Sequence, residues 1–113
     1  MSDQADRMLE IFRQAVQSEL RREEADLTLR QLGIFLVVSQ DTGGQTVRGL
    51  AKALLIGTPV VTRSVDRLSS ADLVKRARDP ADARSVLVMR TELGDAMMRR
   101  LSDAMGAAAA DMG

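Results

Sequence analysis

The stretch GTPVVTRSVDRLSSADLV, residues 57–74, decides the fold because it combines a helix start with a one-sided apolar pattern. We expect Thr58 to cap the helix, and Pro59 suits the first turn, where its missing N–H costs nothing. The apolar residues recur at helical spacing and form one packed side: Val61, Val65 and Leu68. We therefore predict an amphipathic helix over residues 58–70.

The side of this helix opposite the apolar residues is polar and partly basic. It carries Pro59, Arg63, Asp66, Arg67 and Ser70, and it is flanked by Val60 and Thr62. An arginine at such a position can donate two hydrogen bonds to the edge of a guanine. The spacing alone is equally compatible with a solvated helix in which Asp66 pairs with Arg63 or Arg67.

Three helices are predicted ahead of this stretch. Apolar residues at helical spacing indicate a first helix from Asp3 to Ala25. Thr28 and Gln31 form a capping box that opens a second, largely apolar helix, LRQLGIFLVVSQ. Thr46 is expected to cap a short third helix, VRGLAKAL.

After Asp72 the apolar period changes from helical to alternating. Residues 73–90 therefore predict two strands joined by a turn at residues 79–82, and a last helix begins at Glu92. Three helices, a helix with a basic face, a hairpin and a final helix are the arrangement of a winged helix-turn-helix. The fold class expected is mainly α with a small β-hairpin wing.

The composition excludes several classes of protein. The 113 residues include no cysteine and no histidine, so disulfides, thiol chemistry and histidine-based zinc sites have no residues to use. No apolar run is long enough to span a membrane and no signal pattern is present, so we expect a cytoplasmic protein without metal or cofactor. The net charge is zero, but residues 41–91 hold nine Lys and Arg against five Asp and Glu. A local basic region of this kind is what phosphate contact requires.

Three motifs at fixed spacing give the pattern a family resemblance: VTRSVDRL in the predicted basic helix, DPADARSVLV across the hairpin, and RTELG at the start of the last helix. Together they resemble the winged-helix core of the MarR (multiple antibiotic resistance regulator) family of transcription factors, over roughly residues 28–98. Asp72 stands where the family usually has Gly, and Gly57 where it often has a capping Ser. The residues after the hairpin leave room for about one helix, where family members commonly have two.

The resemblance implies a sequence-specific DNA-binding transcriptional regulator, expected to be a homodimeric repressor acting on a pseudo-palindromic operator. It places the helix 58–70 in the major groove and the wing 79–84 in the minor groove. The expected major-groove residues are Thr58, Pro59, Val60, Thr62, Arg63, Asp66 and Arg67, with Asp66 orienting an arginine. The expected wing and backbone contacts are Arg48, Lys52, Lys75, Arg76, Arg78, Asp82 and Arg84, with Asp82 bracing Arg84.

We expect one winged-helix domain, in which residues 1–27 and 92–113 form dimerisation helices around the core 28–91. The expected interface residues are Met8, Ile11, Phe12, Leu93, Met97, Leu101 and Met105. The methionines of the last helix also suit an adaptable ligand surface, but a dimer interface is the better interpretation. Family members often release DNA on binding a small molecule, and the sequence identifies no effector.

A second function class stays open. A winged helix can bind protein instead of DNA, for example by forming a heterodimer with a related regulator, and the acidic ends and zero net charge favour this alternative. An enzyme is poorly supported, because the sequence offers no catalytic constellation.

Overall fold

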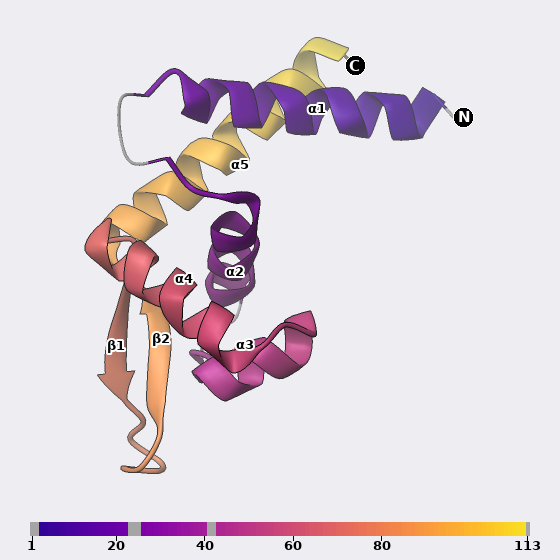
Figure 1. Ribbon diagram of the computed structural model, residues 1–113. Helices are drawn as coiled ribbons and strands as arrows, with labels where there is room; N and C mark the ends of the chain where they lie inside the picture. Colours follow the sequence, from indigo (N-terminus) through magenta and orange to yellow (C-terminus); the bar gives the residue numbers. More distant parts are fainter. Residues whose placement is uncertain (1–2, 23–25, 41–42, 113) are drawn as a thin grey trace. The chain divides into compact units, whose positions relative to one another are not determined.

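The computed structural model describes residues 3–22, 26–40 and 43–112. In chain order the elements are α1 (Asp3–Leu20), α2 (Leu29–Gln40), α3 (Val47–Leu54), α4 (Thr58–Ser70), β1 (Val74–Arg78), β2 (Val86–Arg90) and α5 (Glu92–Met112) (Figure 1). The predicted fold, mainly helical with one antiparallel hairpin, is confirmed. The chain divides into two compact units, Met1–Asp26 with Ala96–Gly113, and Leu27–Asp95. None of the helices described is long and apolar enough to cross a membrane.

The first unit contains α1 and most of α5, which are joined by hydrogen bonds from arginines. Arg100 donates to both carboxylate oxygens of Glu19, with N–O distances of 3.0 Å. Arg7 donates to the carbonyl oxygen of Met112 at 3.1 Å. The helix α1 ends at Leu20, earlier than the predicted end at Ala25, which itself lies outside the described residues.

The helix α2 supplies the centre of the second unit, as its apolar sequence predicted. The capping box forms: the Thr28 amide donates to Gln31 Oε1 at 3.0 Å, and the Gln31 amide donates to Thr28 Oγ1 at 3.1 Å. Its inner face includes the two largest fully buried side chains of the core, Phe35 and Ile34, together with Val38. The helix α2 packs chiefly against α4, which fixes α4 in place.

The turn between α3 and α4 sets the start of α4. Thr46 caps α3 as predicted, because Gly49 N donates to Thr46 Oγ1 at 2.9 Å. The N-cap of α4, however, is Gly57 and not Thr58, so that prediction was wrong. The Gly57 carbonyl accepts from Val61 N at 3.2 Å, which already places Thr58 inside the helix. Pro59 permits the earlier start, because an amide is unnecessary throughout the first helical turn.

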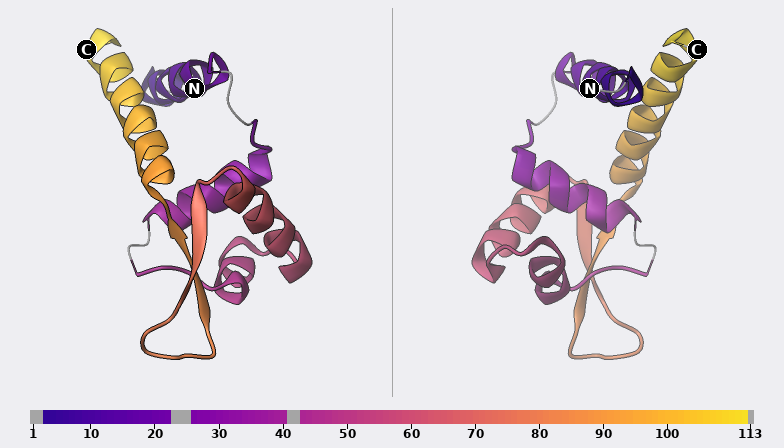
Figure 2. Two further views of the ribbon diagram at one scale, coloured as in Figure 1. Left: turned by 90° about the vertical axis from the view of Figure 1, so that its left-hand side faces the viewer. Right: turned by 90° about the vertical axis from the view of Figure 1, so that its right-hand side faces the viewer.

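The helix α4 ends in a left-handed turn that leads into the hairpin. Asp72 takes φ 59°, in the left-handed region, and Leu73 N donates to the Leu68 carbonyl at 3.0 Å. The strands pair in antiparallel register from Val74 opposite Arg90 to Arg78 opposite Val86. Gln45 adds one isolated bridge to Val88, which the sequence did not predict. Figure 2 shows the loop of the hairpin extending beyond α3 and α4.

The hairpin and α5 meet in a tightly packed joint within the second unit. The Arg90 guanidinium donates to Asp95 Oδ1 at 2.5 Å and to the carbonyl of Ser39 at 2.9 Å, so it links the end of β2 to both α5 and α2. A Cβ atom at Gly94 would lie 2.3 Å from the carbonyl oxygen of Leu73. Only glycine allows α5 to begin this close to the hairpin.

Candidate nucleic-acid interface

The helix α4 presents a fixed outer face because its inner face is locked in the core. Val61, Val65 and Leu68 are all 0% exposed, so the helix cannot rotate without exposing them to water. Of the residues of α4 predicted to contact DNA, five are exposed: Thr58, Pro59, Thr62, Arg63 and Asp66. Val60 and Arg67 are half-buried at the flanks of this face. The predicted packed side of the helix is confirmed, whereas Arg67, predicted on the outer side, is half-buried.

Asp66 pairs with an arginine, but the arginine is not on its own helix. Its carboxylate accepts from Arg76 Nη2 at 2.6 Å, where the sequence had suggested Arg63 or Arg67. The reason is tertiary, because β1 folds back against α4 and brings Arg76 within reach. Within the described residues Arg63 makes no hydrogen bond or ion pair, so its guanidinium is available to a ligand.

The wing is shaped by two aspartates that bond to the backbone. Asp79 Oδ1 accepts from the Ala81 amide at 2.9 Å, and Asp82 Oδ1 accepts from the Arg84 amide at 3.0 Å. Asp82 Oδ2 also accepts from the Ser85 hydroxyl at 3.2 Å. Asp82 therefore fixes the turn around Arg84, and the predicted brace to the side chain of Arg84 is replaced by a bond to its backbone.

The remaining predicted cations lie on the surface of the same unit. Lys75, Arg76 and Arg78 on β1 and Arg84 in the wing are exposed. Arg48 and Lys52 are exposed one turn apart on α3. The second unit thus carries exposed cations on α4, on the hairpin and on α3. In the part of the chain that is described, no three acidic side chains come together as a metal site.

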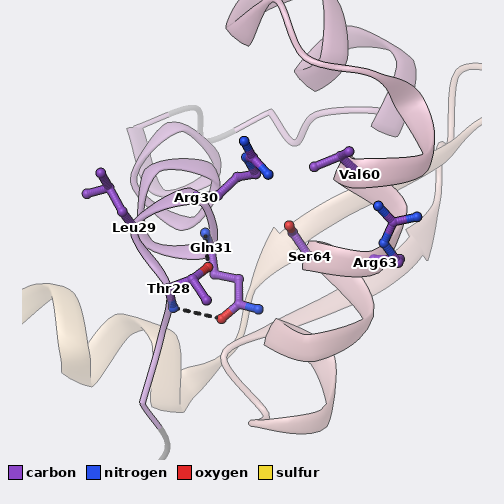
Figure 3. Close-up of a pocket in the computed structure, with 7 residues that line it drawn as sticks. All are labelled: Thr28, Leu29, Arg30, Gln31, Val60, Arg63 and Ser64. Atoms are coloured by element: carbon purple, nitrogen blue, oxygen red, sulfur yellow. Dashed lines mark hydrogen bonds between the residues drawn. The ribbon is translucent and has the colours of Figure 1, made fainter.

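A pocket of about 550 Å³ separates the start of α2 from the first half of α4 (Figure 3). Its lining residues are Thr28, Leu29, Arg30, Gln31, Val60, Arg63 and Ser64, none of which is acidic. The close-up shows the side chain of Arg30 extending from α2 toward α4. Sequence reasoning missed Arg30 and Ser64, because only the packing of α2 on α4 brings them to one pocket.

The residues predicted for a dimer interface differ in how far the chain itself covers them. Met8, Phe12, Leu93 and Met105 are 61%, 47%, 53% and 38% exposed. Ile11 and Leu101 are half-buried. Met97 is only 8% exposed, so most of its surface is already covered within one chain. Leu9 and Leu20 are exposed as well and were not predicted.

The sequence profile of the MarR family matches residues 25–85, which is more than half of the chain and includes α2, α3, α4 and the wing turn. The chain belongs to the MarR family. Its class is therefore that of the MarR transcriptional regulators. No curated protein sequence matches it at a significant level.

Solved MarR-type structures share the fold over nearly the whole chain. RV1404 from Mycobacterium tuberculosis is 22% identical with a TM-score of 0.75, over 96% of this chain and 71% of that one. MarR from E. coli in its apo form is 24% identical with a TM-score of 0.66, over 96% and 75%. CouR from Rhodococcus jostii RHA1, bound to p-coumaroyl-CoA, is 22% identical with a TM-score of 0.66, over 92% and 68%. These likenesses establish a MarR-type winged-helix fold.

Proposed function

We propose that this MarR-family chain is a homodimeric repressor that binds a pseudo-palindromic DNA operator. The observation that carries the proposal is the outer face of α4, where Arg63 has no protein partner in the described residues while three fully buried side chains hold the helix in place. A rigid helix with a free arginine suits direct recognition of base edges in the major groove. As a regulator of bacterial DNA it would act in the cytoplasm.

On α4 the roles follow from side-chain chemistry. Arg63 donates to the O6 and N7 atoms of a guanine, and Pro59 and Val60 contact thymine methyl groups. Thr58 and Thr62 donate to phosphate oxygens, and Arg67 adds positive charge at the flank. Asp66 contributes by holding Arg76 close to the helix, as its 2.6 Å ion pair supports.

The wing and α3 supply contacts that position the protein. Arg84 enters the minor groove, where the negative potential is greatest when the groove is narrow. The turn held by Asp82 supports this role, because it fixes the backbone from which Arg84 projects. The remaining cations contact phosphates without specifying sequence: Arg48, Lys52, Lys75, Arg76 and Arg78.

The dimer is proposed to form through the apolar residues of α1 and α5. Its central members are the exposed side chains Met8, Phe12 and Met105, with Ile11, Leu93, Met97 and Leu101 beside them. A two-fold dimer would place its two α4 helices about one helical turn of DNA apart. This geometry explains why the operator is proposed to be an inverted repeat.

Selection from a random duplex pool at near-physiological salt, followed by sequencing, tests the proposal. We expect an inverted repeat with half-site centres about 10 bp apart. The recovered site, placed over a promoter in a reporter, should lower expression if the protein represses. A folded protein that enriches no sequence would overturn the proposal and favour a winged helix that binds a related regulator instead.

A further inference from the structure

The pocket between the start of α2 and α4 gathers hydrogen-bond donors and positive charge, with no acidic residue in its lining. We propose that it binds one phosphodiester group of the DNA backbone, through Arg30 and Ser64, with Arg63 at its rim. The inference rests on the proposed function and deepens it, because it adds a contact on α2 beside the face of α4 that enters the groove.

Arg30 lies where its charge is unfavourable to the protein alone. It is in the first turn of α2, and the amino end of a helix carries a partial positive charge that repels cations. No acidic residue accompanies it in that turn, and in the described part of the chain its side chain has no hydrogen bond or ion pair. An anion bound beside it would be attracted both by the guanidinium and by the helix end.

The backbone at the start of α2 has amide donors that no group within the helix accepts from. The capping box satisfies the amides of Thr28 and Gln31, and the Leu32 amide donates to the Thr28 carbonyl at 2.9 Å. The amides of Leu29 and Arg30 have no partner inside a helix, as helix geometry requires for its first turn. Free amides at a helix start are a common binding element for phosphate groups.

Ser64 is an independent sign of a ligand. It is only 6% exposed, yet among the described residues its hydroxyl has no hydrogen-bond partner. The other nearly buried serine behaves differently: Ser39, 8% exposed, donates to the carbonyl of Phe35 at 2.7 Å. Figure 3 shows the Ser64 hydroxyl directed from α4 toward α2 and into the pocket. The residue is almost fully buried, but its hydroxyl is not a buried atom without a partner, so it can donate to an acceptor that enters the pocket.

The shape of the pocket favours DNA over a small free anion. Sites for small molecules are concave and bury most of the ligand. This pocket is open to solvent, and the two arginines in its lining, Arg30 and Arg63, are both exposed. Arg63 belongs at once to the pocket and to the outer face of α4, so the backbone strand bordering the groove would pass directly over the site.

The test compares Arg30→Gln with wild type in binding to a random-sequence duplex, since phosphate contacts need no operator. Arg99→Gln is the matched control, because it removes the same charge from an exposed position on α5. In Arg30→Gln we expect the slope of log affinity against log salt to shrink by about 0.9. The loss of affinity between about 50 and 200 mM salt would then be about 3.5-fold smaller than for wild type. Arg99→Gln should keep the wild-type slope.

Ser64→Ala separates the hydroxyl from the charge. We expect several-fold weaker DNA binding with an unchanged salt slope and an unchanged unfolding temperature, because the variant removes a donor that has no partner within the protein. Circular dichroism verifies the fold of each variant. Because Arg30 is exposed, its variant decides the question even if Ser64→Ala does not fold.

The outcomes distinguish the two proposals. A wild-type protein that binds no duplex would overturn the proposed function itself. DNA binding by wild type together with an unaltered slope in Arg30→Gln would overturn only the pocket assignment. A second experiment tests whether the pocket binds a free anion instead of DNA. Inorganic phosphate is titrated into DNA-free protein, and the guanidinium NMR signals of Arg30 and Arg63 report its binding. Saturation of both signals combined with an unaltered DNA slope would assign the pocket to a free anion instead.

Discussion

Arg63 and Lys75 represent two kinds of contact with different energetic consequences. Arg63 is exposed on the fixed face of α4, whereas Lys75 is exposed on β1. We expect Arg63→Ala to reduce discrimination at one base position by about 1–3 kcal/mol. Lys75→Ala should weaken binding to all sequences alike and reduce the salt slope by about one. Binding of both variants to a set of single-base operator changes checks this, and identical profiles would show that the roles are wrongly assigned.

Glu10 on α1 offers a prediction about pH. Hydrogen bonds from Arg13, and a further one from Gln14, hold the pKa of Glu10 at about 2, below its ordinary value of 4.5. A pKa that is lower in the folded state stabilises the fold above about pH 4.5, and this contribution is lost as the pH falls toward 2. In Arg13→Gln we expect the pKa of Glu10 to rise toward 4.5, as followed by NMR of its carboxyl carbon.

Gln17→Ala is the control for that titration, because Gln17 accepts a hydrogen bond from Arg13 without contributing to the low pKa of Glu10. Its midpoint should stay near 2. A midpoint that does not move in Arg13→Gln would show that the ion pair between Arg13 and Glu10 is not formed in solution.

At the scale of the elements, the start of α5 depends on a close approach that only glycine permits. A Cβ at Gly94 would meet the Leu73 carbonyl oxygen at 2.3 Å and Arg90 Cγ at 2.7 Å, whereas nothing lies within 4 Å of a Cβ at Gly106. We expect Gly94→Ala to destabilise the fold by about 1–3 kcal/mol. Gly106→Ala, in the same helix, should stabilise it by up to about 1 kcal/mol. Chemical denaturation measures both, and equal stability of the two variants would refute the tight joint.

Local sequence was sufficient for features whose determinants are a few residues apart. The bonds between Thr28 and Gln31 and the cap at Thr46 follow from neighbouring side chains and backbone geometry. The start of α4 was misplaced by one residue because Pro59 is compatible with either start. Local signals therefore located the elements more reliably than their first residues.

Contacts between distant elements could not be predicted in this way. Asp66 had candidate partners on its own helix, but the strand that packs against it supplies Arg76 at 2.6 Å. For the same reason the sequence did not predict that Arg30 and Ser64, which are 34 positions apart, line one pocket. Periodicity shows which face of a helix is buried, whereas the choice of partner depends on how the elements pack.

For the whole molecule, the zero net charge is the sum of a basic middle and two acidic ends. The basic residues 41–91 fall in the unit Leu27–Asp95, and the acidic ends fall mainly in the other unit. Attraction to phosphates depends on local charge, so a neutral total does not argue against DNA binding. The charge distribution implies that DNA associates with the unit Leu27–Asp95, which carries the basic residues.

The last prediction concerns the proposed dimer. Two copies can bind the operator together only if an interface away from the DNA joins them. Met8 and Phe12 lie four residues apart on α1, are 61% and 47% exposed, and so form one apolar face. We expect Phe12→Glu to give monomers in sedimentation and to lower operator affinity by about 10²-fold or more, since the two half-sites are no longer bound together.

Leu29→Glu is the matched control for sedimentation, because Leu29 is 83% exposed but lies on α2, outside the proposed interface. It should sediment like wild type. A Phe12→Glu protein that remains dimeric would move the interface away from this face of α1. A wild-type protein that is monomeric would contradict the homodimer, and an inverted repeat recovered by selection would then require two chains to assemble only on DNA.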